Sequence, residues 1–219
     1  VETGEADACI KGLYTKDSNT IKVATEVIGL QNGYKHFGTM HILNSKKGTY
    51  FVADTLINRT HDVDSLIDIA RLSEKTVRFF NHEPVMAMLS YSNFGSDPEG
   101  SPAKVHEAVA YMQNEYPELA IDGEMQVKYA MNNTARDEKY PFTRLKGKDV
   151  NTLIFPNLSS ANATYQLIQS MSETEVIGPI QMGLNKPIHF TDCEASVRDI
   201  VTITAIAVID AIVDKKKNQ

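Results

Sequence analysis

Small polar residues form a run at positions 90–96 that could bind an anion such as phosphate. The run directly follows the continuous apolar stretch 85–89, which is typical of a strand covered on both faces. Hydroxyls and backbone N–H groups in a loop after such a strand are suited to phosphate. An ordinary strand-to-helix turn has the same composition, so both interpretations stay open. The candidate ligand contacts in this run are Ser90, Ser92, Asn93, Gly95 and Ser96.

Three more polar segments follow apolar runs, at 122–124, 156–162 and 178–183. The paired acids of the first could act as general acid and base, although an aspartate at a helix start is more often a cap. The amides of the second could bind an extended ligand or cap a helix, and the third has the composition of a tight turn. At equivalent ends of one sheet, these segments would form a polar ligand crevice. Its candidate contacts are Asn157, Asn162, Gln181 and Gly183.

The rest of the pattern predicts the elements that position these loops, because apolar runs of strand length alternate with segments of helical periodicity. We expect strands at 6–13, 37–43, 49–53, 85–89, 119–121, 150–155 and 176–180. We expect helices to begin near residues 18, 62, 101, 123, 159 and 196, and we expect the polar segment 133–148 to be a mobile loop. This alternation is typical of an α/β fold with a mainly parallel, doubly wound sheet.

The composition excludes several classes of function. The 22 Lys and Arg residues are outnumbered by 28 Asp and Glu residues, and the net charge of −6 argues against binding to nucleic acid or an anionic membrane. Two cysteines, Cys9 and Cys193, cannot form a disulfide scaffold, and this low number favours a reducing, cytoplasmic location. The six histidines lack the spacing of a metal site, and the glycine motifs of nucleotide-binding loops are absent.

Several sequence blocks resemble the phosphate acetyl/butyryltransferase family over nearly the whole chain. The blocks lie at 5–7, 51–55, 87–92, 120–124, 154–157, 177–187 and 199–201. The resemblance implies two α/β lobes with a cleft between them, similar to isocitrate dehydrogenase, and a dimeric assembly. It also implies a truncated first lobe, with residues 1–33 and 188–219 as its remaining parts and residues 34–187 as the second lobe. Phosphotransacetylases of this family transfer an acetyl group between coenzyme A and phosphate.

The chain differs from such enzymes at the positions where they carry their reacting residues. The family's serine and arginine at the reacting centre correspond to Asp192 and Cys193, and a second arginine corresponds to Ser170. A third corresponds to Lys22, which keeps the charge but loses the planar fork, whereas the assisting acid is retained as Asp199. A carboxylate would repel phosphate, and a thiol cannot replace a bidentate guanidinium. These differences argue against transferase activity.

One subgroup of the family resembles this chain in the way it differs from the active transferases. Blocks at 92–96, 122–126, 195–201 and 204–211 resemble the C-terminal phosphotransacetylase-like domain of large NADP-dependent malic enzymes. In those proteins a separate domain, which uses NADP and a divalent metal, converts malate to pyruvate. The appended domain is associated with oligomerisation and with sensing acetyl-CoA. The resemblance therefore implies no cofactor in this part of the protein, an acyl-CoA effector, and a homo-oligomer of at least two copies.

Three hypotheses follow from the sequence. The leading one is a regulatory, acyl-CoA-binding and oligomerising domain without transferase chemistry. The second is an active phosphate acetyl- or butyryltransferase that uses altered residues. The third is a scaffold whose cleft binds nothing.

Overall fold

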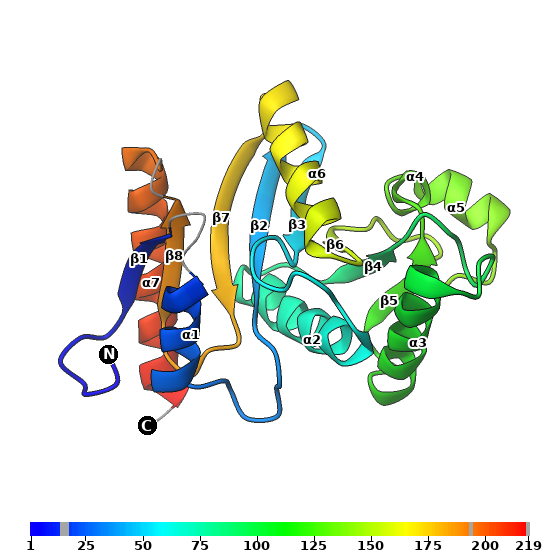
Figure 1. Ribbon diagram of the computed structural model, residues 1–219. Helices are drawn as coiled ribbons and strands as arrows, with labels where there is room; N and C mark the ends of the chain where they lie inside the picture. Colours follow the sequence, from blue (N-terminus) through cyan, green and yellow to red (C-terminus); the bar gives the residue numbers. More distant parts are fainter. Residues whose placement is uncertain (14–17, 193–194, 218–219) are drawn as a thin grey trace.

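The computed structural model describes residues 1–13, 18–192 and 195–217, which form two β-sheets (Figure 1). The larger sheet has the order β5-β4-β6-β3-β2-β7, and the smaller pairs β1 with β8. The strands are β1 (Cys9–Leu13), β2 (Gly38–Ser45), β3 (Gly48–Ala53), β4 (Val85–Leu89), β5 (Ala120–Met125), β6 (Thr152–Ile154), β7 (Glu175–Met182) and β8 (Ile188–Asp192). The helices are α1 (Ser18–Val27), α2 (Val63–Phe79), α3 (Gly100–Glu115), α4 (Val127–Ala130), α5 (Asn133–Lys139), α6 (Leu158–Met171) and α7 (Val197–Lys217).

The direction of the strands decides which loops can meet. Strands β3, β6, β4 and β5 are parallel, so their carboxyl ends lie at one edge of the sheet. Strand β2 is antiparallel to both β3 and β7, and β7 therefore runs in the same direction as the parallel strands. The start of β7 consequently lies at the opposite edge from the loops that follow β4 and β5. The predicted α/β class with a mainly parallel sheet is confirmed.

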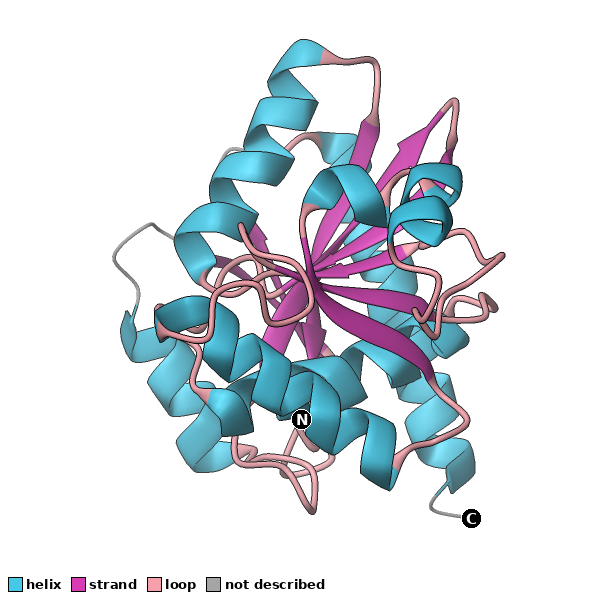
Figure 2. Ribbon diagram, turned by 90° about the vertical axis from the view of Figure 1, so that its right-hand side faces the viewer, coloured by secondary structure: helices cyan, strands magenta, loops and turns pink. Residues whose placement is uncertain are grey.

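Helices cover both faces of the larger sheet (Figure 2). Apolar residues of α2 and α3 form one core with side chains such as Met40 and Phe51. On the other face, Ala161 and Tyr165 of α6 pack with Val52 and other strand residues in a second core. Helix α7 packs on the smaller sheet and on β7. Residues from distant parts of the sequence are thus held on rigid elements.

Most elements lie where the apolar pattern predicts them, including β4 at its expected bounds. Helix α2 begins after Asp62, whose carboxylate accepts a hydrogen bond from the Ser65 N–H. The helix expected to begin at residue 123 is wrong, because 123–125 extend β5 and only the short helix α4 follows. Helix α3 begins at Gly100, after the cap position Glu99 and before the expected start at Ser101.

The prediction of a mobile loop at 133–148 is also wrong. The segment contains α5, and Arg136 of that helix is fully buried. Its Nη2 group donates hydrogen bonds to the carbonyl oxygens of Leu145 and Lys148, at 2.6 and 2.8 Å. A buried arginine that binds two backbone carbonyls orders the polar chain around it, because leaving this charge unpaired would be costly.

A buried carboxylate, Asp54, organises the turn after β3. Its Oδ1 accepts hydrogen bonds from the N–H and hydroxyl of Thr39 on β2, both at 2.9 Å. Its Oδ2 accepts from the N–H and Nδ2 of Asn58, both at 2.7 Å. The N–H groups of Leu56 and Ile57 approach Oδ1 at 3.3 and 3.4 Å. Asp54 has no solvent exposure, so these donors replace its hydration.

Next to this turn, His41 of β2 is buried between the sheet and α6. Its Nδ1 lies 2.8 Å from the Thr55 hydroxyl, and its ring stacks on Tyr165 with 4.1 Å between the centroids. Burial lowers the pKa of His41 to about 3. The imidazole is therefore neutral in the folded protein at every pH near neutrality.

We predict that Asp54→Ala lowers the free energy of unfolding by about 3–5 kcal/mol, since several buried donors lose their acceptor. The matched control is Asp64→Ala, which removes an exposed carboxylate paired with Lys35. That change should cost about 1 kcal/mol or less. Urea unfolding measures both variants, and equal losses would contradict the role given to Asp54.

We also predict an acid-sensitive component of stability from His41. In the unfolded chain a histidine binds a proton below about pH 6.5, whereas folded His41 stays neutral down to about pH 3. The free energy of unfolding should therefore fall as the pH is lowered through this window, by ~1.4 kcal/mol per pH unit from this residue. Denaturation of wild type and His41→Gln between pH 7 and 4 measures the difference. Parallel curves would contradict the prediction.

Candidate functional site

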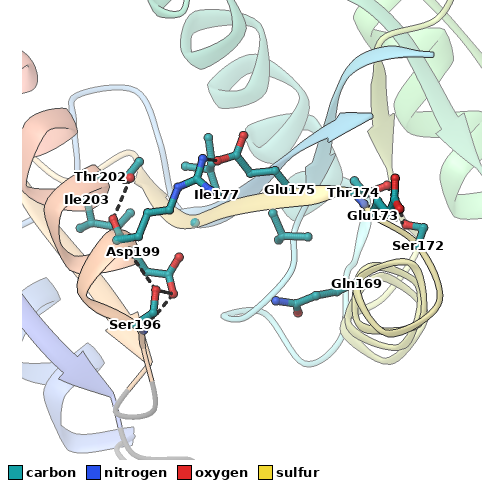
Figure 3. A pocket seen from close by; sticks show the side chains of 13 residues that line it. Gln169, Ser172, Glu173, Thr174, Glu175, Ile177, Ser196, Asp199, Thr202 and Ile203 are labelled. Atoms are coloured by element: carbon teal, nitrogen blue, oxygen red, sulfur yellow. Dashed lines mark hydrogen bonds and ion pairs between the residues drawn. The ribbon is translucent and has the colours of Figure 1, made fainter. Parts of the chain in front are cut away.

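A cavity of about 460 Å³ lies between the larger sheet and α7, where β7 begins, α6 ends and α7 begins (Figure 3). Gln169 and Ser172 lie on the α6 side, and Ser196, Asp199 and Thr202 lie on the α7 side. The floor between them comes from the first residues of β7, 175–178. The walls carry hydroxyl, amide, carboxylate and aliphatic groups, so they could contact both a polar and an apolar part of a ligand.

Asp199, which the sequence resemblance matches to the family's assisting acid, is bound by residues of its own helix start. Its Oδ2 accepts hydrogen bonds from the Ser196 N–H at 2.9 Å and the Ser196 hydroxyl at 2.7 Å. The Asp199 N–H in turn approaches the Ser196 Oγ at 3.2 Å. This reciprocal arrangement is a capping box at the start of α7. The geometry gives Asp199 a structural role that also places its carboxylate at the cavity.

The cavity wall is rich in carboxylates. Glu173, Glu175 and Asp199 line it, together with one guanidinium from Arg198. The Arg198 Nη2 group donates to Glu175 Oε1 across the cavity, so the first turn of α7 is joined to the first residue of β7. Glu173 forms its own ion pair with Lys46, at 2.8 Å. Among the lining residues that the structure describes, no guanidinium or ammonium group is therefore left without a carboxylate partner.

Arg198 and Glu175 are not among the site residues predicted from the sequence. They are 23 positions apart, and neither belongs to a local motif that indicates a partner. The one available signal is that Arg198 directly precedes Asp199 in a block that matched the family.

Of the residues that the resemblance matches to the family's reacting positions, Ser170 lies beside this cavity. Ser170 is an exposed residue of α6 between the lining residues Gln169 and Ser172, and its hydroxyl donates to the Gln166 carbonyl at 2.8 Å. Asp192 ends β8, and its side chain lies outside the described part of the structure, as does all of Cys193. Lys22 is an exposed residue of α1 whose ammonium lies 3.7 Å from Glu26.

The loop 90–96 lies at the other edge of the sheet and uses its polar groups internally. The hydroxyls of Ser92 and Ser96 lie 2.8 Å apart, and the Asn93 N–H donates to the Ser96 Oγ. The Gly95 N–H donates to the carboxylate of Glu124, which is fully buried. Ser90 Oγ accepts from the Ser92 N–H at 3.3 Å. These contacts are those of a structured turn, and the structure separates this loop from the cavity.

The possible acid–base pair and the predicted tight turn both lie on strands. Asp122 and Glu124 lie within β5, where Asp122 Oδ2 accepts hydrogen bonds from the Thr143 hydroxyl and the Arg144 N–H. Gly178 lies within β7, where an added Cβ would meet His41 at 2.7 Å. Residues that look like loops in the sequence are therefore strand residues at crowded positions.

The remaining candidates lie towards the carboxyl edge of the sheet. Asn157 caps α6 by accepting from the Ser160 N–H, and Asn162 Nδ2 lies 3.4 Å from the Thr55 carbonyl. Gln181 is buried beside Thr39, and its Nε2 has no hydrogen-bond partner among the described residues. Gly183 has a φ of +97° and lies against Leu72. The crevice candidates therefore lie at the carboxyl edge of the sheet, whereas Ser170 and Asp199 lie beside the cavity where β7 begins.

A second cavity, of about 380 Å³, lies between β1 and α7. Its lining is mainly aliphatic, with an ion pair between Asp7 and Lys215 at 2.8 Å. Within residues 1–13, 18–192 and 195–217, no three His, Cys, Asp or Glu side chains are grouped so as to hold a metal ion. The same residues include no helix with the length and apolar character required to cross a bilayer.

Two groups of curated proteins are similar to the chain. The NADP-dependent malic enzyme of Escherichia coli K12 is 39% identical over 212 residues, which cover 96% of this chain and 28% of that protein. The phosphate acetyltransferase of Bacillus subtilis 168 is 32% identical over 212 residues, which cover 97% of this chain and 65% of that enzyme. The chain therefore spans little more than a quarter of the first relative and about two thirds of the second.

Solved phosphotransacetylases share the fold. The enzyme from Streptococcus pyogenes superposes with a TM-score of 0.88 at 30% identity, over 99% of this chain and 65% of that one. The enzyme from Staphylococcus aureus gives a TM-score of 0.84 at 29% identity, with 98% and 65% covered. The family profile described as phosphate acetyl/butaryl transferase matches residues 1–208. The chain therefore belongs to the phosphate acetyl/butaryl transferase family.

Proposed function

We propose that this chain is a non-catalytic phosphotransacetylase-like domain that binds an acyl-CoA, assembles with further copies of itself and regulates a malic enzyme. In this proposal the malic enzyme activity, with its NADP and divalent metal, belongs to a separate domain of the parent protein. The similarity to a malic enzyme of which this chain spans only 28% supports that arrangement. The proposed location is the cytoplasm.

The charge of the cavity is the observation that carries the proposal. Transfer of an acetyl group to phosphate requires cationic groups that stabilise the anion and the charge that develops on the reacting centre. The described lining of the cavity instead has three carboxylates against a single guanidinium, that of Arg198. The position of a family arginine is taken by the uncharged Ser170, whose hydroxyl is bound within α6. Walls of this charge disfavour the transfer of an acetyl group to phosphate.

The same cavity keeps features that support reversible binding of a larger ligand. Ile177 and Ile203 offer aliphatic contacts, and Ser172, Thr174 and Ser196 add hydroxyl groups to the same lining. A thioester ligand has both an apolar acyl chain and polar amide groups, which suits walls of this mixed character. Binding without chemistry is what a sensing domain requires.

We predict saturable binding of acetyl-CoA in the micromolar range, measured by isothermal titration calorimetry. In a coupled assay with phosphate, the chain should form no acetyl phosphate under conditions in which the Bacillus subtilis phosphate acetyltransferase is active. Acetyl phosphate formation at a rate comparable to that enzyme would overturn the non-catalytic part and favour an active transferase. The absence of binding at millimolar acetyl-CoA would instead favour the scaffold hypothesis.

The oligomeric part of the proposal has a separate test. Sedimentation velocity of the chain at micromolar concentration should give a mass of at least twice 24.3 kDa. A species of 24.3 kDa that persists up to 100-fold higher protein concentration would contradict self-assembly.

A further inference from the structure

The ion pair between Arg198 and Glu175 crosses the cavity and is open to solvent. The side chain of Arg198 is 77% exposed and that of Glu175 is 38% exposed. Exposed pairs of this kind contribute little to stability, because water and salt compete for both partners. The contact can therefore be exchanged for another at low cost, unlike the buried contacts of Asp54 and Arg136.

Glu175 would keep a partner if Arg198 were withdrawn. Its Oε2 lies 3.4 Å from Asn44 Nδ2 on the neighbouring strand β2, whereas Arg198 binds the other oxygen, Oε1. Partial exposure also allows water to solvate this carboxylate. Loss of the arginine would thus not leave a buried charge unpaired, which is the circumstance that makes breaking an ion pair expensive.

The other carboxylates of the cavity are occupied elsewhere. Glu173 pairs with Lys46 of the turn between β2 and β3, and both side chains are exposed. Asp199 Oδ2 accepts two hydrogen bonds from Ser196 in the cap of α7. Arg198 is consequently the lining cation that an incoming anion could recruit, and Glu175 is the group with which it must compete.

We infer that Arg198 binds the phosphate groups of the acyl-CoA and that Glu175 holds this guanidinium as an internal competitor while the site is empty. The inference rests on the proposed function and names the residue pair that controls binding at its site. A phosphate offers a higher charge density than a carboxylate and can accept two parallel N–H donors from one guanidinium. The exchange transfers Arg198 from Glu175 to the ligand, so this ion pair between α7 and β7 is lost when ligand binds, whereas the packing of α7 on β7 remains.

Two substitutions with opposite expected effects test this inference. Arg198→Gln should weaken acetyl-CoA binding at least 10-fold in calorimetry, because the phosphate loses its cationic partner. Glu175→Gln should tighten binding at least 3-fold, because the competitor is removed while a polar side chain of similar size remains. Arg198→Lys keeps the charge without the fork and should bind more weakly than wild type but more tightly than Arg198→Gln.

A matched control lies on the same wall. Glu173→Gln removes an equal charge that does not contact Arg198, so it should tighten binding by less than 2-fold. Thermal unfolding of each variant establishes that the fold is retained. Inorganic phosphate at high concentration should compete with acetyl-CoA in wild type and lose this effect in Arg198→Gln.

The outcomes separate this inference from the function on which it rests. If wild type binds acetyl-CoA and Arg198→Gln binds it equally well, the inference is wrong and the proposed function stands. If Arg198→Gln and Glu175→Gln weaken binding equally, the pair is structural and the competition is disproved. If wild type does not bind acetyl-CoA at all, the proposed function fails first and this inference fails with it.

Discussion

A carboxylate without solvent contact, Asp54, is the constraint on which the positions of the other elements depend. Its hydrogen bonds join β2 to the turn that follows β3. That turn carries Thr55, whose hydroxyl contacts His41 and whose carbonyl accepts from Asn162 of α6. Helix α6 then extends across the sheet to the cavity. Strand β2 pairs with β7 as far as Glu175, which lines the cavity. The buried polar groups at one edge of the sheet thereby position the exposed polar groups at the other.

The two edges differ in how their polar groups are used. At the carboxyl edge, polar groups of the loop 90–96 bond to one another and to Glu124 of β5, and Asn157 caps α6 by accepting from Ser160. At the start of β7, the groups are exposed and paired across a cavity of about 460 Å³. Binding requires groups that can exchange partners, so the second arrangement suits a ligand site better. Under the proposed function, a fold of the transferase family keeps a binding site but has too few cations for the transfer reaction.

The sequence predicts the strands and helices whose periodicity is set by burial, such as β4 and α2, and it places the start of α2 near residue 62. It fails where polar residues are buried by partners far away in the chain. Arg136 makes an ordered segment resemble a mobile loop, and Asp122 and Glu124 make the end of a strand resemble the start of a helix. Arg198 and Glu175 become neighbours only through the packing of α7 beside β7, which no local pattern specifies. Site residues taken from a family resemblance therefore located Asp199 at the cavity but not the ion pair beside it.

Hydrogen–deuterium exchange with and without saturating acetyl-CoA tests most directly where the ligand binds. Bound ligand should slow exchange in the two cavity walls, 172–178 and 196–203, and should leave 90–96 unchanged, because the backbone donors of that loop are already engaged. Protection confined to 90–96 and the start of α6 would contradict the account and would return the site to the carboxyl edge of the sheet.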